Sequence, residues 1–334
     1  MTEILFYITG VLLLIIFYLV YKALRLLYIS KKRPLTSVKS NDVNAYLMLA
    51  FLLLFLGGFW GYSFYVSDEG LAEAASEHGD RVDKLFWIAT TVILIPFTLL
   101  HILLFWAAFR FRHKKDRSAK YYPYNFKLEI SWTVITAGTL IALIAMGIIL
   151  WSDVKSPPPK EAEVVEILGA QYVWFIRYPG TDGKLGKTDY RLIDDKNSFG
   201  MNLNDPAATD DFTPPRIHIP KGQPVLFLIR SRDVIHSVFA PHFRLKMDAV
   251  PGMTTQFWFI PKYTTEEMRS KTGNPDFNYE IACAEICGRG HFAMKMIIVV
   301  EEPEDYREWY QQQRSWVSQH PAYLSNHGNQ NKYK

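Results

Sequence analysis

Four long apolar runs in the first half of this 334-residue chain constrain its fold more than any other feature. They lie between charged residues and cover 4–21, 43–67, 85–109 and 130–152. Each is rich in Leu, Ile, Phe, Val and Trp and can cross about 30 Å of hydrocarbon as a helix, the first only just. The runs exclude a simple soluble globular chain and predict four membrane spans.

The first run could also be part of a cleaved signal sequence. However, its N-terminal region contains only Glu3 where a basic residue is expected. No small-x-small cleavage motif follows before Lys22 and Arg25. We therefore interpret this run as a retained span.

Charges in the loops predict the orientation of the spans. The segment 22–42 has six basic residues against one acidic residue, and 110–129 has seven against two. The loop 68–84 between them has six acidic residues against two basic ones. Because basic loops stay on the cytoplasmic side, the first two segments are predicted to be cytoplasmic. The N-terminus and the large C-terminal region then lie outside, in the periplasm or its mitochondrial equivalent.

The region after Trp151 has the pattern of a β domain. Pro157, Pro158 and Pro159 predict a stiff linker. Short β-rich runs follow, separated by Gly, Pro, Asn and Asp, with no convincing helix between them. The runs are 163–168, 171–178, 224–230, 234–239, 255–260, 277–282 and 295–300. They predict an antiparallel sandwich or barrel.

Two further segments complete this outer region. The stretch 180–215 is rich in Gly, Asp, Asn and Pro and is predicted to be a long surface excursion. A short peripheral helix is expected after Glu304, and the polar tail from about Pro321 is expected to be loose. No long run of like charge, low-complexity tract or repeat indicates nucleic-acid binding.

A cluster of metal-ligand residue types lies in the segment 283–294, CAEICGRGHFAM. Cys283, Cys287, His291 and Met294 follow one another at spacings of four, four and three. Thiolate and thioether favour copper, and imidazole suits copper or zinc. A second imidazole from another strand would complete the set, and His236 is the best placed candidate.

The spacing alone leaves several kinds of site open. A Cys-x-x-x-Cys pair can form a plain disulfide, which leaves the histidine and methionine unexplained. Two Cys with two His can hold one zinc, which leaves Met294 unused. A single blue copper needs only one thiolate. Two coppers bridged by two thiolates use every residue.

The two segments 283–294 and 233–252, the latter DVIHSVFAPHFRLKMDAVPG, resemble the binuclear-copper (CuA) segments of cytochrome c oxidase subunit II. This is the electron-accepting subunit of the heme-copper respiratory oxidases. The resemblance covers about residues 70–310, and its motif is highly specific, because quinol-oxidizing relatives lack the copper ligands. It implies a fold of four transmembrane α-helices followed by an external all-β cupredoxin-like barrel. The first two spans are an addition that the common form lacks.

The resemblance implies a set of metal ligands: His236, Cys283, Glu285, Cys287, His291 and Met294. The two thiolates would bridge the coppers, and each imidazole would cap one of them. The thioether and the backbone carbonyl of Glu285 would be weak ligands. The Glu285 carboxylate would reach a magnesium ion shared with subunit I.

Other roles are also implied by the resemblance. Glu129 matches a carboxylate at the mouth of a proton-uptake channel, although a helix-start acid with a favourable dipole contact is the ordinary reading. Tyr172 stands where the family has its electron-entry tryptophan, and Trp174 follows two residues later. Which ring meets the donor is left open. His242 has no ligand counterpart and is assigned to the surface.

The expected protein is therefore subunit II of a bacterial inner-membrane cytochrome c oxidase with its CuA domain in the periplasm. It would take electrons from cytochrome c, or from a cytochrome c domain of a respiratory complex, and pass them to heme in subunit I, where dioxygen is reduced to water and protons are pumped. Its other expected partners are the remaining oxidase subunits and the lipid membrane. Acidic residues such as Asp205, Asp210, Asp211 and Asp233 could steer a basic donor. The rival interpretations are a membrane-anchored copper chaperone on a thioredoxin-like fold and a structural zinc module.

The resemblance also divides the chain. Residues 1–67 would form the extra transmembrane hairpin and 68–153 the subunit II hairpin. Residues 154–304 would form the CuA domain, and 305–334 the peripheral helix and tail.

Overall fold

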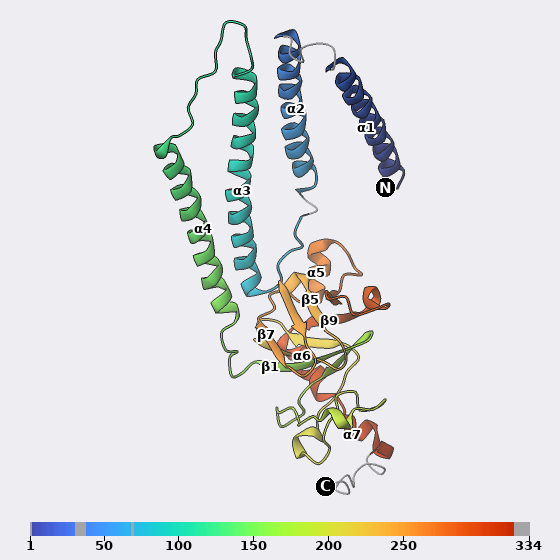
Figure 1. The fold of residues 1–334 in the computed structure, drawn as a ribbon. Helices are drawn as coiled ribbons and strands as arrows, with labels where there is room; N and C mark the ends of the chain where they lie inside the picture. The colour runs from blue at the N-terminus through green and yellow to red at the C-terminus, as the bar shows by residue number, and fades with distance from the viewer. Residues whose placement is uncertain (1, 31–37, 68–69, 324–334) are drawn as a thin grey trace. The chain divides into compact units, whose positions relative to one another are not determined.

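The computed structural model describes residues 2–30, 38–67 and 70–323 (Figure 1). Parts of the basic segment 22–42, of the acidic loop 68–84 and of the C-terminal tail fall outside the described residues. Four long helices come first in the chain: α1 (Thr2–Ser30), α2 (Val38–Tyr65), α3 (Glu77–Arg110) and α4 (Phe126–Val154). All four are long and apolar enough to cross a membrane. The prediction of four spans is confirmed.

The helices α2 and α3 contact each other within one of two compact units of the chain. The ring of Phe55 lies 5.5 Å from that of His101 and 6.1 Å from that of Phe97. Arg112, two residues after the end of α3, pairs with Asp42 near the start of α2, with 2.6 Å between nitrogen and oxygen. Aromatic packing and one ion pair therefore hold this pair of helices together.

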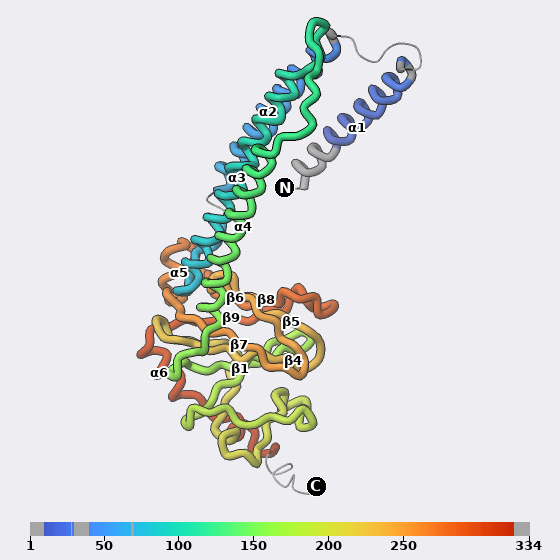
Figure 2. The backbone as a smooth tube through the Cα atoms, turned by 60° about the vertical axis from the view of Figure 1, so that its left-hand side comes forward, coloured from blue at the N-terminus to red at the C-terminus, as the bar shows by residue number. Residues whose placement is uncertain are grey.

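The other unit contains a two-sheet β domain. The first sheet has the order β2 (Val173–Arg177), β1 (Glu163–Ala170), β4 (Val225–Ser231), β7 (Thr255–Phe259). The second has the order β3 (Ile217–Pro220), β9 (Lys295–Glu301), β8 (Tyr279–Cys283), β5 (His236–Ala240), β6 (Leu245–Ala249). Figure 2 follows these strands along the backbone. The seven predicted β-rich runs all correspond to strands.

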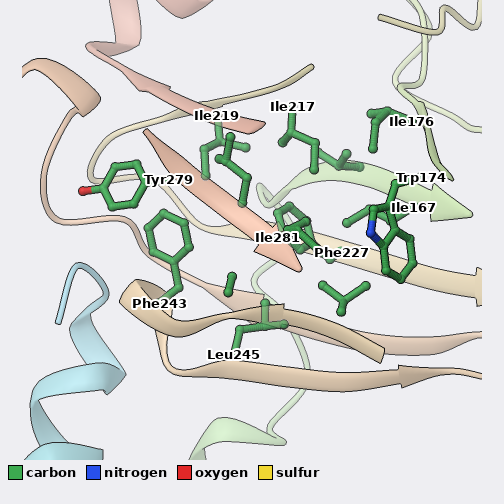
Figure 3. Close-up of a cluster of buried hydrophobic side chains, with 14 of the residues drawn as sticks. Ile167, Trp174, Ile176, Ile217, Ile219, Phe227, Phe243, Leu245, Tyr279 and Ile281 are labelled. Carbon is green, nitrogen blue, oxygen red and sulfur yellow. The ribbon is translucent and has the colours of Figure 1, made fainter. Parts of the chain in front are cut away.

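Apolar side chains of both sheets form the core of the domain. Along β4 every second residue is buried, so that Val225, Phe227 and Ile229 point to the same side. Figure 3 shows Phe227 and Ile167 of the first sheet beside Ile281 of the second. This shared core fixes the strands whose ends carry the metal-ligand residue types.

The expectation of purely antiparallel pairing is wrong. The strand β1 pairs with β4 in parallel, with Val165 opposite Phe227, and β3 pairs with β9 in parallel. The reason is that the chain leaves the first sheet after β2 and adds β3 to the second sheet before it returns as β4. All other pairs of these strands are antiparallel.

The expectation of no helix between the strands is also wrong. The helix α5 (Thr265–Thr272) lies between β7 and β8. Thr264 and Glu267 form a capping box at its start, and Gly273, at a φ of 64°, ends it. These are local polar signals in a helix with few apolar residues, so hydrophobic periodicity does not reveal it.

The C-terminal segment and the excursion after β2 pack together. The helices α6 (Pro303–Gln311) and α7 (Trp316–Gln319) agree with the expected short peripheral helix. Trp316 and Tyr323 are buried with Phe199 and Met201 of the excursion. The tail is therefore ordered as far as Tyr323, contrary to the expectation, and residues 324–334 lie outside the described residues.

Residues 70–83 are tied to one end of the β domain. Ser76 Oγ donates to the carbonyl of Phe243 at 2.8 Å, and Ala75 N donates to the carbonyl of His242 at 2.7 Å. Arg244 makes a two-point ion pair with Asp83 at 2.6 and 2.7 Å. His242 is half-buried, with its ring edge-on to that of Phe277, and it lies on this side of the domain and not among the candidate ligands.

Candidate metal centre

The topology places the candidate ligands at one end of the neighbouring strands β5 and β8, in the interior of the second sheet. His236 begins β5 and Cys283 ends β8, and these strands are antiparallel neighbours with Val238 opposite Cys283. The backbone N–H of Cys283 donates to the carbonyl of Met294 at 3.1 Å. This bond closes the loop on itself, so that the twelve predicted residues encircle one small volume.

The six predicted copper ligands come together at these strand ends: His236, Cys283, Glu285, Cys287, His291 and Met294. The two Sγ atoms lie 3.9 Å apart. His236 Nδ1 lies 3.9 Å from Sγ of Cys283, and His291 Nδ1 lies 3.7 Å from Sγ of Cys287. Met294 Sδ is 3.8 Å from Sγ of Cys287. The backbone oxygen of Glu285 is 3.1 Å from Sγ of Cys283.

These distances separate the alternatives left open by the sequence. A disulfide needs sulfurs about 2.05 Å apart, and both cysteines are free. In a tetrahedral zinc site with bonds of about 2.0–2.3 Å, all donors lie within roughly 4 Å of one another. Among the residues that the structure describes, only His236, Cys283 and Cys287 form such a group, with ligand atoms within 4.8 Å, and His291 lies outside it. The distances therefore argue against a disulfide and against one compact tetrahedral site that uses both cysteines and both histidines.

Burial of the two cysteines affects the protonation of their thiols. Cys283, Cys287, His236 and Met294 are all buried. Burial and the neighbouring Cys283 thiol raise the pKa of Cys287 to about 11. Because the thiolate is the form that binds metal, a bound cation must compensate the negative charge. A soft metal cation bound by these buried side chains meets this requirement.

Asp233 orients the first imidazole, a role that sequence analysis missed. Its carboxylate lies 2.9 Å from Nε2 of His236 and accepts the backbone N–H of Gln171 at 2.7 Å. Burial alone would raise the pKa of Asp233, but these hydrogen bonds hold it below its usual value. With Nε2 held by Asp233, Nδ1 is directed at the sulfurs. The only signal in the sequence is a carboxylate three residues before the histidine.

Tyr172 lies over the ligand loop at the surface. Its side chain is 39% exposed, and its hydroxyl accepts the backbone N–H of Arg289 at 3.0 Å. A Cβ at Gly288 or Gly290 would come within about 2.5 Å of the tyrosine side chain, since the closest approaches are 2.4 and 2.5 Å. The two glycines therefore allow the ring to rest directly on the loop.

Trp174 lies behind the site. It is only 1% exposed, and its ring is edge-on to that of His236 with centroids 5.8 Å apart. A Cβ at Gly169 would come within 2.9 Å of both rings, so this glycine lets them meet. The structure thus assigns different positions to the two aromatic candidates, one outside the loop and one inside the barrel.

Glu129 is in the first turn of α4, and the backbone N–H of Asn125 lies 3.3 Å from its carboxylate. This is the contact of an ordinary helix-start acid. Glu285 has an exposed side chain on the ligand loop, so its carboxylate is available to a group outside this chain.

Comparisons with known proteins cover both the spans and the β domain. Residues 65–150 match the family described as cytochrome c oxidase subunit II, transmembrane domain, and residues 164–302 match its periplasmic domain. The chain is 38% identical over 240 residues to the alternative cytochrome c oxidase subunit 2 of Bradyrhizobium diazoefficiens, covering 71% of this chain and 80% of the relative. It is 27% identical to cytochrome c oxidase subunit 2 of Cereibacter sphaeroides, covering 73% and 80%.

Among solved structures, the chain is similar to the periplasmic domain of subunit II of the cytochrome oxidase of Bradyrhizobium japonicum. The match has 22% identity and a TM-score of 0.32, and it covers 46% of this chain and 95% of that one. The predicted fold class is confirmed: apolar helices are followed by a cupredoxin-like β domain that corresponds to the family's periplasmic domain.

Proposed function

We propose, from the premise that this chain belongs to the cytochrome c oxidase subunit II family, that its outer domain is the electron-entry module of the oxidase. In this proposal the domain takes single electrons from an external cytochrome c and delivers them toward heme in subunit I. The oxygen-reducing site lies in that partner, where reduction of dioxygen to water is coupled to proton pumping. The observation that carries the proposal is the clustering of six candidate metal donors, two of which are the free cysteines Cys283 and Cys287.

The residues present fit a binuclear copper centre. Cys283 and Cys287 would hold both coppers, with His236 on one side and His291 on the other. Met294 and the Glu285 carbonyl would be the weak ligands. When bound, such a centre supplies a one-electron acceptor whose charge is shared between two metals.

The chain itself supplies rigidity and a dry pocket. Asp233 fixes the ring of His236, and the Gln171 side chain donates to the carbonyl of Cys287 at 2.5 Å. These bonds hold donors from two separate segments in place before any metal arrives. A preformed donor set has little to rearrange when an electron arrives, and this favours fast transfer.

We assign electron entry to Tyr172, with Trp174 in a supporting role. Tyr172 is the exposed ring that rests on the ligand loop. Trp174 is enclosed and touches the imidazole of His236, so it positions that ring. A donor at the surface can approach the first ring and not the second.

The proposal also includes the roles of Glu285 and Glu129, the membrane location and the division of the chain that were expected from the sequence. Glu285 would bind a magnesium ion with subunit I, and Glu129 would lie at the mouth of a proton channel. The protein would sit in a bacterial inner membrane with its outer domain in the periplasm. Residues 1–67, 68–153, 154–304 and 305–334 would be its four parts.

The copper-chaperone rival predicts a different fold. It requires a thioredoxin-like α/β domain, whereas residues 163–301 form two β-sheets with the single α-helix α5 among their described residues. The donors also come from one loop and a preceding strand. Such an arrangement suits a site that keeps its metal, whereas a chaperone must release it.

Stopped-flow kinetics on the purified oxidase complex tests the proposal. Reduced cytochrome c is mixed with the oxidised complex, and oxidation of the donor is followed beside reduction of the heme. We expect rapid transfer in the wild type and loss of transfer in Cys287→Ser, with heme content unchanged. Ser318→Ala, in α7, is the control. Equal donor oxidation in the wild type and in Cys287→Ser would refute the proposal.

A further inference from the structure

A cleft of about 330 Å³ lies between the first sheet and the excursion after β2. The strands β1 and β4 contribute Leu168 and Arg230 to its lining. The excursion contributes four residues between 188 and 199, and the turn between β6 and β7 contributes residues 251–254. Its volume is within the range of clefts that bind small molecules. The proposed function makes no use of this cleft.

Two arginines line the cleft, and none of its described lining residues is acidic. Arg230 is held by the fold. Its Nη1 donates to the hydroxyl of Thr188 at 2.7 Å, and its Nε lies 2.9 Å from the carboxylate of Glu166. The side chain of Arg232 is exposed, and the described residues show no ion pair to it. The cleft therefore combines one fixed guanidinium group with one that has no charged partner.

The buried carboxylates nearby do not neutralise both arginines. Glu166 pairs with Arg177 at 2.5 Å as well as with Arg230, so one carboxylate serves two guanidinium groups. Arg177 has a second partner in Asp211, at 3.0 Å. These four charges sum to zero when Asp211 is ionised. The charge of Arg232 is then surplus.

Three acids that adjoin lining residues in the chain accept hydrogen bonds elsewhere. Asp189 and Asp194 accept backbone N–H groups of the excursion at 2.8 or 2.9 Å. Asp233 accepts the backbone N–H of Gln171 at 2.7 Å and contacts His236. The charged groups that line the cleft are therefore two guanidinium groups and, among the described residues, no carboxylate.

Much of the remaining lining is apolar. Leu168 and Phe199 are buried, Ile193 is partly buried, and Met253 is 53% exposed. Apolar side chains stabilise a ligand by removing its apolar surface from water. A ligand that matches both parts of the cleft thus has an anionic group and an apolar body.

We infer that this cleft binds a small organic anion, in which a carboxylate or phosphate group is attached to an apolar body. Arg230 and Arg232 would bind the anionic group, because the planar guanidinium group matches the geometry of carboxylate and phosphate. The apolar side chains would cover the body of the ligand.

The cleft adjoins the turn that leads to His236. The backbone N–H of Arg232 donates to the carbonyl of Gly169 at 2.9 Å, and a Cβ at Gly169 would come within 2.9 Å of the His236 ring. The residue after Arg232 is Asp233, which orients that ring. Because negative charge opposes the addition of an electron nearby, a bound anion would lower the reduction potential of the copper centre. This regulatory role rests on the proposed function, whereas anion binding itself does not.

Isothermal titration calorimetry on the purified full chain, in nanodiscs of zwitterionic lipid, tests the binding. The probes are benzoate and phenyl phosphate, with benzyl alcohol as the analogue without charge and acetate as the analogue without a ring. We expect at least one aryl anion to bind, acetate to bind roughly tenfold more weakly, and benzyl alcohol not to bind. No binding of either aryl anion, or equal binding of acetate or benzyl alcohol, would overturn the inference.

Two substitutions at exposed positions locate the binding in the cleft. Arg232→Gln removes the surplus charge, and Met253→Glu adds a carboxylate to the lining. Each should weaken binding of the aryl anion roughly tenfold. Arg307→Gln, at an exposed position on α6, removes the same charge as Arg232→Gln and should leave the affinity unchanged. Equal affinities of Arg232→Gln and Arg307→Gln would contradict the assignment to this cleft.

A redox titration of the copper-loaded chain, with and without the aryl anion, tests the regulatory role. We expect a lower potential with the anion in the wild type and a smaller shift in Arg232→Gln at the same concentration. An unchanged potential in a wild type that binds the anion would overturn the regulatory role. A chain that binds the anion but no copper would instead show that the proposed function is wrong.

Discussion

The two ends of β5 and β8 are held together in different ways. At one end, His236 and Cys283 are fixed by hydrogen bonds from Asp233 and the loop backbone, and the donors depend on one another. At the other end, ion pairs join residues 70–83 to the barrel, and each pair is a separate contact. Single substitutions at the ligand end should therefore have near all-or-none effects on copper binding. Substitutions at the other end should have small, additive effects on the stability of the domain.

The largest effect is expected within the ligand set itself. In the proposed centre both metals would depend on the two thiolates, so Cys283→Ser or Cys287→Ser would cost both a strong ligand and the centre should be lost. Met294→Leu removes only a weak thioether and is close to isosteric. It should keep both coppers and shift the reduction potential, and His291→Asn should be intermediate. Copper per chain and donor-oxidation rate are measured for each variant. Equal copper loss in Met294→Leu and Cys287→Ser would show that this ranking is wrong.

Substitution of Asp233, which orients the imidazole of His236, should have a smaller effect on copper binding. Asp233→Asn keeps the size of the side chain but weakens its hold on His236 and on the N–H of Gln171. Copper affinity should fall by about 10–100-fold, the usual cost of losing such a partner. Competition with a copper chelator measures the affinity. Asp248→Asn, exposed on β6, is the matched control, and equal affinities for the two variants would contradict the role of Asp233.

Substitution of Tyr172 should slow electron transfer from the donor and leave copper binding unchanged. Tyr172→Ala removes the exposed ring but no metal ligand, so copper content should equal that of the wild type. Entry of electrons from cytochrome c should slow roughly tenfold, or about 1.4 kcal/mol in barrier height. Stopped-flow reduction measures this rate. An unchanged rate would place electron entry elsewhere on the domain, while copper loss would give Tyr172 a structural role.

The smallest effect is expected at the other end of the barrel. Lys262 pairs with Asp80 at 2.7 Å, and the carboxylate is more than half exposed. Exposed pairs of this kind contribute about 0–1 kcal/mol. Lys262→Met should therefore lower the thermal unfolding temperature only slightly and leave copper content unchanged. Loss of copper in this variant would mean that the two ends are coupled, which would undo the comparison.

Much of this arrangement could be predicted from the sequence because its signals are local. Uninterrupted apolar runs reveal the spans, and β-rich runs between turn residues reveal seven strands. The twelve-residue segment 283–294 places four donor side chains close together regardless of the rest of the fold. His236 comes from a separate strand, and the resemblance to subunit II supplied its role.

The features that escaped prediction depend on tertiary contacts. The strand β3 is only four residues long, and β6 (LKMDA) has mixed polarity, so neither has a clear β pattern. The parallel pairing of β1 with β4 follows from a crossover between sheets. Asp233 was considered a surface charge, because no sequence pattern shows that its carboxylate turns inward to His236. Which side chain contacts which in this way is determined by the folded backbone.

The measurement that tests the central claim most directly is the copper stoichiometry and spectrum of the purified full chain. We predict two coppers per chain, a purple colour and mixed-valence absorption in the near infrared, because two free cysteines lie close together with one imidazole beside each. One colourless zinc per chain, or a single blue copper, would contradict this account.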